Sequence, residues 1–61
     1  MEKINLGQKY NDIGWDLQNG LTAGTPDPDA AIEKYEKAVE CGNTTAMVNL
    51  GNIYRNGAEK I

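Results

Sequence analysis

The sequence has no histidine, and its 61 residues include a single cysteine, Cys41. Without histidine it lacks the commonest general base and a frequent zinc ligand. One cysteine cannot form a disulfide within the chain, and a lone thiol fits a reducing compartment. Nor is there a nucleophile–base set, a metal-ligand cluster or a phosphate-cradling loop, so we expect no enzyme, no metal and no cofactor.

Clustered positive charge and long apolar runs are missing too. Six Lys and Arg against nine Asp and Glu give a net charge of −3, spread along the chain. Phosphate binding needs clustered cations, so nucleic acid is not the expected partner. The opening residues lack the apolar stretch of a signal peptide, and no window reaches the length of a membrane span. We expect a cytoplasmic protein with neither a nucleic-acid nor a membrane partner.

What the chain does have is the apolar periodicity of helices. In the first stretch, about residues 5–19, Leu6, Tyr10, Ile13 and Leu17 follow one another at steps of four, three and four. This spacing forms one stripe on a helix. The second and third helices are expected at 28–41 and 44–56. Residues 1–61 therefore form a single all-α domain of three predicted helices, small enough that its stability is marginal.

Helix-end signals set these boundaries. Asp27 is a suitable N-cap, and Pro28 fits the first helical position after it. Gly42 is expected to end the second helix, Asn43 to cap the third, and Gly57 to close it. Asp27 and Asp29 resemble a metal-binding pair, but capping and the helix dipole account for both.

The first and third helices repeat each other. "NDIGWDLQNG" begins at Asn11 and "VNLGNIYRNG" at Val48, so that Gly51 follows Gly14 by 37 residues. A glycine inside a helix costs about 1 kcal/mol relative to alanine. We interpret Gly14 and Gly51 as places where the second helix packs closely through its small residues Ala31 and Ala38. Chance glycines on a weakly selected surface are the alternative.

These residues resemble the Sel1-like repeat, a relative of the tetratricopeptide repeat. The resemblance covers roughly residues 8–57, and its 37-residue spacing suits this family. The residues that carry it include Ala31, Tyr35, Lys37, Ala38, Gly42, Ala46, Leu50, Gly51, Tyr54, Asn56 and Gly57. It implies an α-α superhelix of one full repeat plus the first helix of a second, a scaffold that binds proteins without catalysis. Lys34, where the family often has an aromatic residue, and the loop 21–26 depart from the pattern.

Two surfaces are candidates for binding. Equivalent faces of repeated helices line up into a shared concave surface, and we expect partner contacts along Asn11, Trp15, Gln18, Val48, Asn52 and Arg55. Trp15 has the character of an interaction hot spot; the alternative is that it covers the edge of the core. The apolar residues of the third helix are Met47, Leu50, Ile53 and Tyr54. Some of them have to pack on the second helix, and we expect the others to form an oligomer interface. Alternatively, the three helices form a closed bundle, and this apolar surface of the third helix is simply exposed to solvent.

Three functions stay open at this point. The first is a protein–protein interaction module or adaptor. The second is a structural unit that self-associates through its unpaired third helix. The third is a small acidic inhibitor or regulator of another protein. The identity of the partner, and whether the chain is a whole gene product or part of a longer array, stay open as well.

Overall fold

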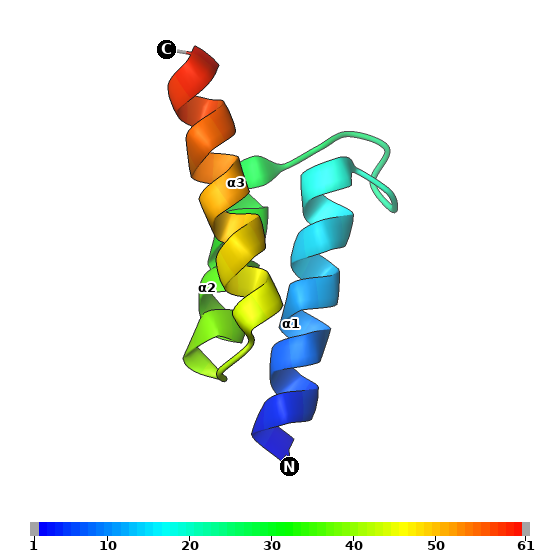
Figure 1. Cartoon of the computed structure of the whole chain (residues 1–61). Helices are drawn as coiled ribbons and strands as arrows, with labels where there is room; N and C mark the ends of the chain where they lie inside the picture. Colours follow the sequence, from blue (N-terminus) through cyan, green and yellow to red (C-terminus); the bar gives the residue numbers. More distant parts are fainter. Residues whose placement is uncertain (1, 61) are drawn as a thin grey trace.

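The computed structural model describes the backbone of residues 2–60 and the side chains of residues 5–55. It consists of α1 (Glu2–Asn19), α2 (Pro28–Glu40) and α3 (Thr44–Lys60), and the described backbone contains no strand. Figure 1 shows α2 running antiparallel to α1, and α3 returning in the direction of α1. The all-α class predicted from the periodicity is confirmed.

Two helices are longer than the sequence indicated. α1 begins at Glu2, and α3 continues through Gly57 to Lys60, so the predicted end at Gly57 is wrong. A glycine ends a helix when its backbone turns left-handed. Gly20 and Gly42 do this, with φ of +65° and +88°. Within the described backbone, none of the helices combines the length and apolar character needed to cross a bilayer.

Side-chain caps set the starts of α2 and α3. Asp27 Oδ1 accepts a hydrogen bond from the Ala30 amide at 3.2 Å, and Asn43 Oδ1 accepts one from the Ala46 amide at 2.8 Å. Each cap satisfies an amide that has no partner inside its helix. Both were predicted from sequence. The turn between α2 and α3 is therefore short and fixed, which holds α3 against α2.

The loop between α1 and α2 is tied to the end of α1. The Asp16 carboxylate accepts hydrogen bonds from both the amide and the hydroxyl of Thr22. Further along, the Asp27 amide donates to the Leu17 carbonyl at 2.7 Å. Hydrogen bonds to the charged form hold the pKa of Asp16 below its ordinary value.

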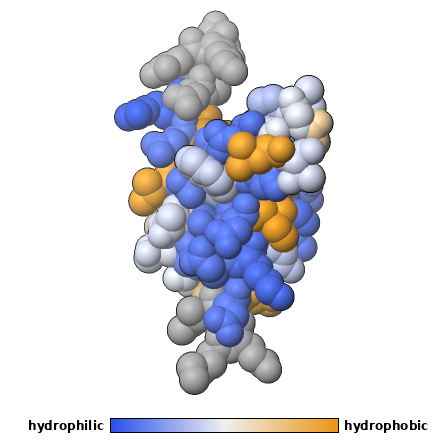
Figure 2. Space-filling view, turned by 90° about the vertical axis from the view of Figure 1, so that its right-hand side faces the viewer, coloured by the Kyte–Doolittle hydropathy of each residue, from blue (hydrophilic) through white to orange (hydrophobic). Residues whose placement is uncertain are grey.

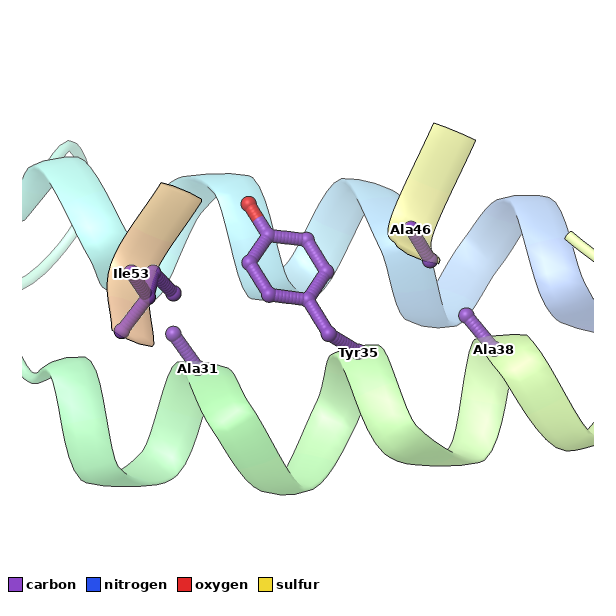
Figure 3. Packing of buried hydrophobic residues seen from close by; sticks show 5 residues of the cluster. All are labelled: Ala31, Tyr35, Ala38, Ala46 and Ile53. Atoms are coloured by element: carbon purple, nitrogen blue, oxygen red, sulfur yellow. The ribbon is translucent and has the colours of Figure 1, made fainter. Parts of the chain in front are cut away.

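The buried core is small and lies along α2. Ala31, Tyr35 and Ala38 of α2 are fully buried, together with Ala46 of α3, and Ile53 is 8% exposed. In Figure 3 the two α3 residues approach the α2 residues from the opposite side of the cluster. Helix α2 thus packs against both neighbours, and it is the central element of the domain.

Candidate docking surface

The packing of α1 on α2 is centred on Tyr35 and Gly14. A Cβ atom placed on Gly14 would lie 2.7 Å from Cε1 and 2.8 Å from Cδ1 of Tyr35, closer than real Cβ atoms come. Figure 3 shows the ring pointing from α2 toward α1. At the far end of the ring, the Tyr35 hydroxyl donates a hydrogen bond to Gln18 Oε1 at 2.7 Å. Gly14 therefore forms a slot for the ring, and Gln18 binds its hydroxyl.

Larger side chains flank this slot on α1. Tyr10 and Leu17 are both partly buried and pack against the core. The ammonium groups of Lys34 and Lys37 lie 5.9 and 5.8 Å from the centroid of the Tyr10 ring. This distance allows a cation–π attraction. Lys34, the departure from the family pattern, thus finds a partner on α1.

Gly51 does not play the role predicted for it. A Cβ atom placed on Gly51 meets nothing within 4 Å, and the residue is exposed. The prediction that α2 packs against both repeated glycines is therefore wrong for Gly51. The reason is that α3 is turned about its own axis so that Ala46 and Ile53 face α2, and these two residues lie on a different stripe of the helix from Gly51.

The apolar residues predicted as an oligomer interface divide between two faces of α3. Ile53 is buried and Leu50 is partly buried against the core, so neither forms an open interface. Met47 and Tyr54 remain 57% and 54% exposed. They stand four residues before and three residues after Gly51, which places all three on one helical stripe. We call Met47, Gly51 and Tyr54 the open face of α3.

The line of residues predicted to contact a partner is also divided, in this case between internal contacts and exposed positions. Asn11 is 7% exposed, and its Oδ1 accepts a hydrogen bond from Asn49 Nδ2 at 3.1 Å. Gln18 is occupied by the Tyr35 hydroxyl. These two are internal contacts, because that side of α1 turns toward its neighbouring helices. The remaining residues of the line are exposed: Trp15, Val48, Asn52 and Arg55.

Several residues that hold the helices together were not predicted from the sequence. Gly7 is buried, and a Cβ atom there would lie 3.1 Å from Cβ of Cys41. Its equivalent 37 residues later is Thr44, so no repeated glycine marked it. The Asp16–Thr22 contact joins a helix to a loop, which no periodicity reveals. Ala46 carried part of the family resemblance, but it was not expected in the core.

An open hollow of about 330 Å³ lies between the end of α1 and the loop. Its lining includes Ile13, Leu17 and two carboxylates, Asp16 and Asp27. Both carboxylates already accept hydrogen bonds from the chain itself. Among the described residues, no group of three or more His, Cys, Asp and Glu is placed to hold a metal ion.

Comparisons with family models, with curated proteins and with solved structures found no match to this chain. The candidate site therefore has to be interpreted from its own geometry. Its leading feature is the open face of α3, which is apolar, half-exposed and centred on a glycine.

Proposed function

We propose that the chain is a protein-recognition module that binds another protein through the open face of α3. The observation that carries the proposal is the exposure of Met47 and Tyr54 on either side of Gly51. Exposed large apolar side chains that share one helical stripe are candidates for an interaction site. A glycine between two large side chains also lets the backbone of a partner approach closely.

We further propose that the helices belong to an α-α superhelix of the Sel1-like type. Three features support this: the antiparallel pair of α1 and α2, the return of α3 in the direction of α1, and the spacing of 37 residues between Gly14 and Gly51. In such stacks each helix pair cannot bury its apolar surface alone, and neighbours complete the core.

Trp15 is a second contact in this proposal. Half of its surface is exposed, and aromatic residues with free surface are enriched among interface hot spots. We assign no catalytic role to the chain, because the carboxylates of its open hollow are already engaged in hydrogen bonds. The partner that we propose is a protein.

Affinity capture from the source cell tests the proposal with three forms of the chain. The test variant carries Met47→Glu and Tyr54→Glu, which place charge on the open face. The control carries Glu33→Gln and Glu36→Gln on exposed positions of α2. We expect proteins retained by the wild-type chain and the control to be lost with the test variant. Equal retention by all three forms, with unchanged melting, would overturn the proposal.

Self-association is the second candidate, because another copy of the chain could cover the same open face. Light scattering across about two decades of concentration, with a melt at each point, separates the two. A dimer whose melting temperature rises with concentration supports self-association, since mass action ties such stability to protein level. A monomer whose melting temperature does not change with concentration supports binding of a different protein on the open face of α3.

A further inference from the structure

The open face of α3 repeats the covered face of α1. Adding 37 to the positions of Tyr10, Gly14 and Leu17 gives Met47, Gly51 and Tyr54 in the same order. Each set is a glycine between two large apolar side chains on one helical stripe. On α1 this stripe receives the ring of Tyr35 from α2. The same surface on α3 has no occupant within the described chain.

Helix α3 has a second apolar stripe beside the one that packs on α2. It meets α2 through Ala46, Leu50 and Ile53, and it presents the open face beside them. The equivalents of the packed stripe on α1 are Lys9, Ile13 and Asp16: Lys9 is exposed, Ile13 is a single apolar residue that is 45% exposed, and Asp16 is hydrogen-bonded to the loop. Figure 2 shows mostly hydrophilic surface with separate apolar patches on the α1 side. Another helix is therefore expected on the open face of α3 rather than on this side of α1.

The end of the slot differs between the two helices. On α1, Gln18 accepts the hydrogen bond of the Tyr35 hydroxyl. The equivalent position on α3, 37 residues later, is Arg55, which is exposed. A guanidinium group donates hydrogen bonds and cannot accept them. An aromatic side chain in the Gly51 slot gains a hydrogen bond from Arg55 if it offers an acceptor at its tip, as the phenol oxygen of tyrosine does.

Charge also distinguishes α3 from the other helices. Between residues 5 and 55, every Asp and Glu precedes Thr44, so the stretch Thr44–Arg55 carries Arg55 as its single charged residue. An acidic helix therefore meets no carboxylate along this stretch, which makes it the least repelling surface of a chain whose net charge is −3, and Arg55 attracts it locally. Met47 replaces Tyr10 and offers no aromatic ring, so the occupant has no need of lysines such as Lys34 and Lys37.

We propose that the open face of α3 binds an acidic helix of another protein that carries a tyrosine between small residues. The seam follows that of Ala31, Tyr35 and Ala38, with small residues four before and three after the tyrosine. The tyrosine ring lies on Gly51, its flanks contact Met47 and Tyr54, and its phenol oxygen accepts a hydrogen bond from Arg55. This inference rests on the proposed function and names the occupant of the same face.

The test measures binding of a fluorescent peptide to the full chain by anisotropy. The peptide has the sequence of residues 27–43 with Lys34→Glu and Lys37→Glu, which removes the contacts to Tyr10 and favours α3 over α1. A second peptide adds Tyr35→Phe. We expect the tyrosine peptide to bind about two- to tenfold more tightly than the phenylalanine peptide, the range that one hydrogen bond supplies. Arg55→Ala in the chain should abolish this difference.

Gly51→Leu is the decisive variant, because position 51 is open and leucine is the better helix former. We expect its melting temperature to equal or exceed that of the wild-type chain, while peptide affinity falls about tenfold or more because the slot is filled. Thr45→Leu adds the same side chain at an exposed position of α3 away from the open face and should leave affinity unchanged.

Two results of the peptide experiment would overturn the inference. One is the absence of saturable peptide binding. The other is binding that Gly51→Leu does not weaken, which would place the peptide on α1 in exchange for α2. If the capture experiment depends on Met47 and Tyr54 while the peptide does not bind, the proposed function stands and only this occupant is wrong. If the chain binds a second copy of itself through Gly51, the occupant is likewise wrong.

Discussion

The ring of Tyr35 lies against the backbone of Gly14, and its hydroxyl donates a hydrogen bond to Gln18 one turn further along α1. A single side chain thus sets both the distance between α1 and α2 and their register. Ring burial needs the glycine, and the hydrogen bond satisfies the one polar atom that burial takes from water. These three residues are the centre of the α1–α2 contact.

This contact predicts opposite effects of the same substitution at the two repeated glycines. Gly14→Ala should lower the free energy of unfolding by about 1–3 kcal/mol, because the added methyl group overlaps the Tyr35 ring. Gly51→Ala should raise it by about 0.5–1 kcal/mol, because the position is open and alanine is the better helix former. Urea denaturation monitored by circular dichroism measures both. If the two variants changed stability in the same direction, the close approach at Gly14 would be refuted.

Much of the fold follows from local sequence signals. The stripe of Tyr10 and Leu17, the caps Asp27 and Asn43, and the left-handed Gly42 each depend on a few neighbouring residues. Such signals act within one or two turns of helix, so the sequence alone reveals them. The repeat added the correspondence of α1 and α3, from which a close approach of α2 at Gly14 was inferred. The prediction that Ala31 and Ala38 make this contact is wrong, because the side chain that lies on Gly14 is Tyr35.

The remaining features depend on how the helices are rotated against each other. The repeat predicts the same close contact with α2 at Gly14 and at Gly51, yet α2 covers only Gly14. The same rotation buries Ile53 and Asn11, which were expected on interaction surfaces. Two apolar stripes lie side by side on α3, and periodicity does not say which of them faces α2. Only the packed arrangement distinguishes the stripe that forms the core from the stripe that is left open.

Stability at high pH should depend on Tyr35. Burial raises the pKa of its hydroxyl above the ordinary value of 10.0, so the folded state holds the phenol proton more tightly than the unfolded state does. This contribution is fully present below pH 10 and is lost as the pH rises through the folded-state pKa. We expect the free energy of unfolding to decline above about pH 10, and the decline to shrink in Tyr35→Phe.

The same substitution has an effect at neutral pH. Tyr35→Phe removes the hydrogen bond to Gln18 and should cost about 1 kcal/mol. Denaturant titrations at pH 7 and at several values above 9 measure both effects in one series. An alkaline decline as steep in Tyr35→Phe as in the wild-type chain would assign it to other groups.

The hydrogen bond from Asn49 to Asn11 should couple α3 to α1. Asn11 is 7% exposed, so truncating either partner leaves a poorly solvated amide and should cost about 1–2 kcal/mol. In a double-mutant cycle with Asn11→Ala and Asn49→Ala, we expect a coupling energy of about 1 kcal/mol. The exposed pair Gln8 and Asp12, also hydrogen-bonded at 2.9 Å, is the matched control, with an expected coupling of about 0.2–0.5 kcal/mol. Equal couplings would show that burial adds nothing to the Asn11 contact.

The contact between Asp16 and Thr22 should make the loop sensitive to acid. The Thr22 hydroxyl, and to a smaller extent its amide, lower the pKa of Asp16 from its ordinary value of 3.8. The contribution of this contact to stability is therefore present above pH 3.8 and is lost as the pH falls through the folded-state pKa. Thr22→Val keeps the amide but removes the hydroxyl, the larger cause of the shift. We expect the Asp16 pKa, measured by NMR titration of its carboxyl carbon, to rise toward 3.8 in Thr22→Val. Thr25→Val, in the same loop, should leave it unchanged, and a shift of equal size there would point to loss of loop order rather than loss of this hydrogen bond.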